Sequence, residues 1–259
     1  MRLLLPIFAA GALALGADAA DAKVMHVTLR GRVDLDFVWI PPGSFQMGCP
    51  MGEADEQPAR RVELRRGFWM SRCEISQRQY ESVMSTNPSS FRGPELPVDS
   101  VSFRDIQNFL SKLPLRSSLP ADLQARLPTE AEWEYACRGG AAAPTPEQPS
   151  PAALAETAWF ADNSRLATHP CGLLAGNGFG LHDMLGNVWE WCNDSYLERY
   201  YALAESHEDP RGPQVGSTRV LRGGSWRSEA EACRPANRFQ YRIWARDHTV
   251  GFRIVLISR

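Results

Sequence analysis

The stretch Gly180–Asp194, GLHDMLGNVWEWCND, packs two tryptophans and several oxygen-bearing side chains into one short segment. Gly186 and Asn187 favour a turn near its centre. Asp183 and Glu190 flank that turn, and two carboxylates with backbone carbonyls between them suit a hard cation such as Ca²⁺. The alternative interpretation is a glycine turn between buried elements, with its acids hydrogen-bonded to backbone. The apolar positions that we predict to be buried are Leu181, Met184, Leu185, Val188, Trp189 and Trp191.

Four further motifs occur in order along the chain: FVWIPPGSFQMG (Phe37–Gly48), RLPTEAEWEYACRGG (Arg126–Gly140), RVLRGGSW (Arg219–Trp226) and GFRIV (Gly251–Val255). With the central motif, they make the chain resemble the formylglycine-generating enzyme, or sulfatase-modifying factor, family. The resemblance implies an α+β domain with an irregular fold related to C-type lectins and little regular secondary structure. We predict one such domain over residues 37–259. Residues 20–36 form an N-terminal lead-in, in which Lys23–Phe37 is a strand pair or a mobile segment.

The N-terminus has the pattern of a secretory signal peptide. Met1–Arg2 is basic, Leu3–Leu15 is apolar but too short to span a bilayer, and Ala17–Ala19 supplies an A-x-A cleavage site. We therefore predict a signal peptide at 1–19; a buried N-terminal strand is the alternative. The compact signal favours a bacterial periplasmic location. No later stretch is long enough to cross a membrane, so we expect a protein that does not itself span one.

Charge and cysteine usage restrict the function classes further. The net charge is −2 with both signs spread along the chain, so no basic stripe argues for nucleic acid binding. Six cysteines in an exported protein can form disulfides, but their spacing leaves the pairing open and lacks the CxxC pattern of structural zinc sites. The resemblance implies a bridge from Cys137 to a position that Arg238 occupies here, so that bridge is not expected. The cysteines are Cys49, Cys73, Cys137, Cys171, Cys192 and Cys233.

Capping residues predict three helices. Ser76 with Gln79 forms a capping box before Gln77–Met84. Thr129 with Glu132 opens another helix, which ends near Gly139. Between them, Ser102 caps a helix whose i, i+3, i+4 and i+7 positions form a core stripe of Ile106, Phe109, Leu110 and Leu113.

Two groups of potential metal ligands have a simpler structural interpretation. Glu130, Glu132 and Glu134 lie on the third helix, and the first two are in its first turn, where the helix dipole favours negative charge. His169 and His182 have no partner at ligand spacing, and we interpret them as hydrogen-bonded loop histidines.

The resemblance implies a copper chemistry that this chain lacks the residues to perform. Enzymes of the family oxidise a substrate cysteine to formylglycine with molecular oxygen, using two cysteines of the C-terminal arm that bind Cu(I) as thiolates. In the arm Gly223–Arg234, Cys233 matches the second cysteine and Ser228 stands at the first. A serine hydroxyl stays protonated at neutral pH and is a poor Cu(I) ligand, so we expect no copper and no formylglycine formation. Ser225 matches a residue of the family's active pocket, so a pocket can persist. We interpret Cys233 as a buried or disulfide-bonded structural cysteine.

The resemblance also implies a calcium site. The family pattern N-x-x-G-x-A-x-E is D-x-x-G-x-V-x-E in this chain. It implies a structural Ca²⁺ held by the Asp183 side chain, the Gly186 and Val188 carbonyls, and the Glu190 side chain.

Together these observations predict an exported periplasmic regulatory or binding protein without catalytic activity. The resemblance implies that it promotes activation of a membrane threonine kinase controlling type VI secretion, by binding the periplasmic part of that kinase. The alternative is a periplasmic oxidase-like enzyme of siderophore (pyoverdine) maturation. A formylglycine-generating oxidase ranks last, because it would need another thiol within reach of Cys233.

Overall fold

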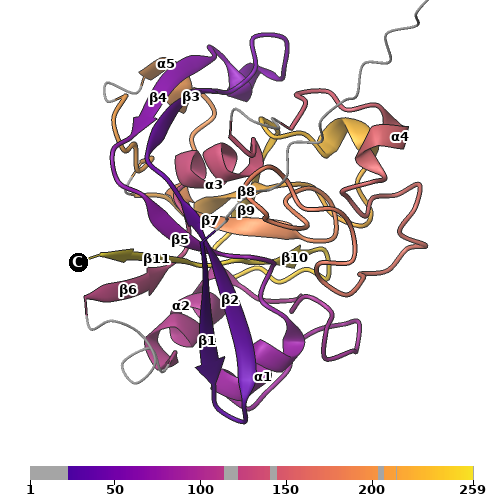
Figure 1. The fold of residues 1–259 in the computed structure, drawn as a ribbon. Coiled ribbons are helices and arrows are strands. Elements are labelled where there is room, and N and C mark those ends of the chain that lie inside the picture. Colours follow the sequence, from indigo (N-terminus) through magenta and orange to yellow (C-terminus); the bar gives the residue numbers. More distant parts are fainter. Residues whose placement is uncertain (1–22, 114–121, 141–144, 204–206, 214, 259) are drawn as a thin grey trace, which may run out of the picture.

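The computed structural model describes residues 23–113, 122–140, 145–203, 207–213 and 215–258, so the predicted signal peptide lies outside it. Short helices and strands alternate with long connections, which confirms the irregular α+β class (Figure 1). None of the described helices is both long and apolar enough to cross a bilayer. The elements are β1 (Val24–Leu29), β2 (Val33–Ile40), β3 (Gly43–Met47), η1 (Ala54–Glu56), β4 (Arg60–Leu64), β5 (Phe68–Ser71), α1 (Gln77–Met84), α2 (Phe103–Lys112), β6 (Leu123–Arg126), α3 (Glu130–Cys137), α4 (Pro151–Leu154), β7 (Trp189–Ser195), α5 (Tyr200–Leu203), β8 (Thr218–Arg222), η3 (Ala230–Ala232), β9 (Arg238–Arg242), β10 (Val250–Gly251) and β11 (Val255–Ser258).

The strands form three sheets, of which the largest has the order β1-β2-β5-β11-β6. Its pairs are antiparallel, and β11 lies between β5 and β6, where Val255 pairs with both Met70 and Arg126. A second sheet has the order β10-β7-β8-β9, and β3 pairs with β4 in the third. The β1–β2 hairpin confirms the strand-pair prediction for Lys23–Phe37, so the sheet begins within the predicted lead-in.

The three predicted helices are confirmed, each with its capping box. The Ser76 and Thr129 side chains accept hydrogen bonds from the N3 amides at 3.3 and 3.2 Å. In α2, Ile106 and Phe109 are fully buried, whereas Leu110 is partly exposed at the rim of the stripe. Local sequence therefore determines these helices, because each cap and its partner lie three residues apart.

The four-stranded sheet separates two hydrophobic clusters. In Figure 1, α3 lies between this sheet and the β3–β4 hairpin, while α1 and α2 pack on the opposite side. Because side chains alternate along strands, Arg222 and Arg238 share the α3 side with Glu190. Trp191 and Leu221 point to the other side, into the cluster that contains Phe109. One face of the sheet is therefore charged and the other aromatic.

Candidate functional site

The central motif enters β7 through a tight turn. Asp183 and Asn187 have φ of +52° and Gly186 has +75°, a region that favours glycine, asparagine and aspartate. A Cβ on Gly186 would lie 2.2 Å from the Trp159 carbonyl oxygen, so no larger residue fits there. The predicted apolar positions are buried with one exception, since Trp189 is only partly buried at the rim of the sheet.

The carboxylates of the motif are buried and have different partners. Asp183 is 2 % exposed, and its Oδ2 accepts a hydrogen bond of 2.6 Å from the Gly172 amide. Its Oδ1 is buried with no hydrogen-bond partner in the described part of the chain. Glu190 accepts from Arg253 Nε at 2.7 and 2.8 Å and from Trp133 Nε1 at 2.7 Å. Asp183 thus accepts from a backbone amide, as the alternative interpretation expects, whereas Glu190 pairs with side chains.

A third buried acid, Glu74, completes this cluster and was not predicted. It accepts from Asn187 Nδ2 at 3.0 Å and from the Val188 amide at 3.3 Å. Burial, followed by the charges of Asp183 and Glu190, raises the pKa of Glu74 well above its usual value. Burial also raises the pKa of Asp183 and Glu190. The cluster thus holds more negative charge than its buried guanidinium, that of Arg253, can balance.

One part of this arrangement suits the predicted calcium site, and another part, the pairing of both Glu190 oxygens with Arg253, competes with it. The excess of buried carboxylate and the unpartnered Asp183 Oδ1 are features that a hard cation would satisfy, with the Gly186 and Val188 carbonyls as further oxygen donors. A cation there would share Glu190 with Arg253 and Trp133. Calcium binding at Asp183, Gly186, Val188 and Glu190 remains a prediction.

At the two positions where the family has its copper-binding cysteines, this chain has the hydroxyl of Ser228 and the buried thiol of Cys233. Ser228 Oγ accepts from the Ser225 amide at 3.0 Å and lies 3.2 Å from Ser225 Oγ, while the Ser228 amide donates to the Ser225 carbonyl at 2.9 Å. Cys233 follows η3 and is 0 % exposed, and burial raises the pKa of its thiol to about 12. A Cβ on Gly224 would lie 2.6 Å from Cys233 Sγ, so backbone covers the sulfur. At neutral pH this arm offers no thiolate pair.

All six cysteines are free, so the predicted disulfide bonding is not confirmed. Cys49, Cys137, Cys192 and Cys233 are buried, as core cysteines often are. Burial raises the pKa of the Cys137 thiol. The side chain at the family's bridging position, Arg238, instead binds Glu130 at 2.6 and 3.0 Å.

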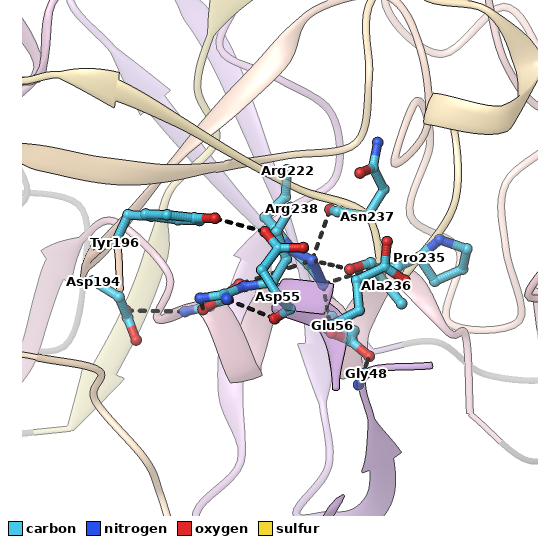
Figure 2. A network of polar contacts seen from close by, with 12 residues as sticks. Gly48, Asp55, Glu56, Asp194, Tyr196, Arg222, Pro235, Ala236, Asn237 and Arg238 are labelled. Atoms are coloured by element: carbon cyan, nitrogen blue, oxygen red, sulfur yellow. Dashed lines mark hydrogen bonds and ion pairs between the residues drawn. The ribbon is translucent and has the colours of Figure 1, made fainter. Parts of the chain in front are cut away.

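The charged face of the sheet forms a network of buried ion pairs that sequence reasoning missed (Figure 2). Arg222 is fully buried and donates to Glu134 at 2.5 Å and to the carbonyls of Pro235, Ala236 and Asn237 at 2.7–2.8 Å. The interpretation of Glu130 as a helix-start acid was incomplete, because Glu130 is buried and paired with Arg238, and Glu134 further along the helix is buried and paired with Arg222. The available signal was Arg222, which directly follows the apolar residues Val220 and Leu221 in β8.

The network fixes the C-terminal arm to the rest of the domain. Arg234 binds both oxygens of Glu56 at 2.6 and 2.9 Å, which joins the residue after Cys233 to η1. Arg238 also donates to the Asp55 carbonyl at 2.7 Å, and Tyr196 donates to Asp55 Oδ2 at 2.8 Å (Figure 2). The arm that carries Ser225, Ser228 and Cys233 is therefore rigidly placed even though it lacks the copper pair.

The predicted loop histidines are confirmed as structural. His169 Nε2 lies 2.7 Å from the Ser164 carbonyl oxygen, and its ring stacks on Trp159 at 3.8 Å between centroids. His182 Nδ1 lies 2.8 Å from the Leu174 carbonyl oxygen.

Comparison with known proteins identifies the family of the domain. Residues 27–257 match the sulfatase-modifying factor enzyme 1-like domain. The chain belongs to this family. It is 31 % identical over 240 residues to the serine/threonine-protein kinase pkn1 of Chlamydia pneumoniae, covering 84 % of this chain and 37 % of that protein. It is 40 % identical over 133 residues to the formylglycine-generating enzyme of Streptomyces coelicolor, covering 47 % of this chain and 40 % of the enzyme.

Solved structures of the family share the fold. PvdO from Pseudomonas aeruginosa superposes with a TM-score of 0.72 at 26 % sequence identity, covering 85 % of this chain and 94 % of PvdO. The chain spans 37–40 % of the length of the two sequence relatives named above. The family assignment and the irregular lectin-like α+β fold are thus established together.

Proposed function

We propose that this family member is a non-catalytic regulatory protein of the bacterial periplasm that binds a membrane threonine kinase controlling type VI secretion and promotes its activation. The observation that carries the proposal is the state of the C-terminal arm. Ser228 is hydrogen-bonded to Ser225, and the Cys233 thiol is buried and protonated. The arm keeps its place through Arg234 and Arg238, so the scaffold persists without the two soft ligands that Cu(I) requires.

Support for a kinase partner comes from the relative named as a serine/threonine-protein kinase. The similarity covers 84 % of this chain but 37 % of that protein, so a domain of this type occurs inside a longer protein with a kinase name. Domains that share one polypeptide in one organism can act as separate, interacting chains in another. A kinase is therefore the favoured partner class for this chain.

Activation would follow from differential binding. If the kinase exchanges between inactive and active arrangements, a protein that binds the active arrangement more tightly shifts the population toward it. A nearly complete switch requires about a 10⁴-fold preference, so the interface must discriminate strongly between the two arrangements.

The second candidate is a periplasmic oxidase-like enzyme of pyoverdine maturation. The structural similarity to PvdO favours it. A cavity of about 500 Å³ beside η3, lined in part by Met51, Glu231 and Arg234, has room for a small or peptidic substrate. A formylglycine-generating oxidase remains the third candidate, because it requires a second thiol near Cys233.

The test combines a copper assay with complementation. The purified protein is loaded with Cu(I) under reducing conditions, and oxygen consumption is measured with a sulfatase-motif peptide; we expect neither tight binding nor turnover. In cells that lack this protein, kinase phosphorylation should be restored equally by the wild type, Ser228→Ala and Cys233→Ser. Copper turnover, or loss of kinase phosphorylation in both variants with the fold intact, would refute a non-catalytic role.

A further inference from the structure

Strand β9 forms one edge of the four-stranded sheet. In the order β10-β7-β8-β9, its strand neighbour among the described residues is β8, with pairs from Thr218–Arg242 to Arg222–Arg238. An open edge presents unpaired backbone donors and acceptors to another strand. Proteins commonly protect such edges with proline, charged side chains, a bulge or a covering element. The β9 sequence RFQYR contains no proline and carries two arginines, of which Arg238 is buried and Arg242 is exposed.

Exposed aromatic side chains accompany this edge. Phe239 is 48 % exposed and stacks on Trp189 with 5.4 Å between ring centroids. Trp244, just beyond the strand, is 53 % exposed. Phe103 of α2 packs against Trp191 deeper in the same face, whereas Phe239 stays at the uncovered rim. Partly exposed aromatic residues next to an arginine are the composition that dominates binding energy at protein interfaces.

Arg242 supplies that arginine and a charge preference. Its guanidinium carbon lies 5.8 Å from the centroid of the Trp244 ring, and the side chain is exposed. Within the described residues Arg242 has no acidic partner, whereas exposed Arg246 binds Asp105 at 2.8 Å. A ligand that places a carboxylate here would gain an ion pair beside the Trp244 ring.

The charges disfavour a second copy of this chain as the occupant. Antiparallel pairing of two β9 strands about Gln240 would set Arg242 of one copy opposite Arg238 of the other. Like charges directly opposite each other destabilise a strand pair. Arg238 is also buried and committed to Glu130, so it cannot turn away.

We propose that β9 is the docking edge for an extended segment of a partner protein, which adds to the sheet as a further strand. The segment carries an acidic residue at Arg242 and an apolar residue against Phe239 and Trp244. Backbone hydrogen bonds supply affinity in this mode and the alternate side chains supply specificity. The inference rests on the proposed function, because it names the surface through which the kinase would be bound.

The first experiment tests the chemistry of the edge. Two short synthetic peptides of alternating valine and threonine carry either one aspartate or one lysine at the central position. We expect the aspartate peptide to bind the wild type at least about fivefold more tightly, and Arg242→Glu to reverse this preference. A version of the aspartate peptide N-methylated at alternate residues should not bind. Equal affinity for the two charges, no binding of either, or unimpaired binding of the methylated peptide would overturn the proposal.

The second experiment separates this inference from the proposed function. The purified periplasmic region of the kinase is titrated with the wild type, with Phe239→Ala/Trp244→Ala, and with Leu173→Ala as an exposed apolar control. We expect at least about a tenfold loss for the double variant and none for the control. Equal binding by the wild type and the double variant would refute the β9 surface and leave the kinase proposal standing. Failure of the wild type to bind the kinase, with the aspartate peptide still bound, would refute the kinase proposal and leave the β9 edge as the docking surface.

Discussion

Replacing Arg222 with methionine tests whether buried ion pairs hold the C-terminal arm in place. The change removes the Arg222 partner of Glu134 Oε2, on a side chain that is 0 % exposed, while Oε1 keeps Arg138 at 2.7 Å. It also removes the donors to three backbone carbonyls. Breaking a buried ion pair by removing one partner costs about 3–5 kcal/mol. In a domain of this size 1 kcal/mol corresponds to about 2–4 °C in Tm, so we expect Tm to fall by roughly 10 °C.

The assay is urea denaturation, with the midpoint and the m value compared across a matched set. Arg65→Met removes an exposed pair with Glu208, whose side chains are 56 % and 49 % exposed, and should cost less than about 1 kcal/mol. Arg222→Met combined with Glu134→Met should recover part of the loss, because the buried carboxylate is removed as well and Arg138 keeps Glu147 at 2.8 Å. If Arg222→Met costs no more than Arg65→Met, the buried pair does not stabilise the arm and the reasoning is wrong.

Three further predictions concern single groups. EDTA should lower the Tm of the wild type by several degrees and leave Glu190→Ala, already destabilised, unaffected; an unchanged wild-type melting curve with no co-purifying metal would exclude the calcium site. Burial and the charge of Glu130 raise the pKa of Asp194 from 3.8 to about 8, so the folded state binds more protons than the unfolded state between these values and stability falls as pH rises through this window. Asp194→Asn should therefore match the wild type near about pH 4 and melt several degrees higher near about pH 9, and a constant difference across melting curves would contradict the shift. Cys233→Ser should cost about 1–2 kcal/mol by placing a hydroxyl in a buried thiol site, measured by denaturation, while a normal stability would show that the site is hydrated.

Local features of this fold were predictable because their causes lie within a few residues. Ser76, Ser102 and Thr129 each sit three residues before their capping partners, and all three helices begin there. The turn at Gly186 was also recognisable from adjacent residues, because Gly186 and Asn187 both favour the left-handed backbone conformation that the turn needs.

Features that depend on distant partners were missed or only partly predicted. Glu130 could be assigned to a helix start, but its partner Arg238 lies 108 residues further along the chain, and Arg222 lies 88 residues beyond Glu134. Trp189 was predicted to be buried because it is a large apolar residue, yet its position at the sheet rim leaves it partly exposed. The cysteine count likewise could not show that all six thiols are free, because pairing depends on the tertiary fold.

The position of β11 has a consequence for how the domain is made. This strand lies between β5 and β6, and it pairs residues 255–258 with partners more than 120 positions earlier in the chain. Such non-local pairing slows folding. Until Val255–Ser258 has emerged from the ribosome, β5 and β6 have no strand between them and the large sheet cannot close. The large sheet of this design is therefore completed only after nearly all of the described chain has been synthesised.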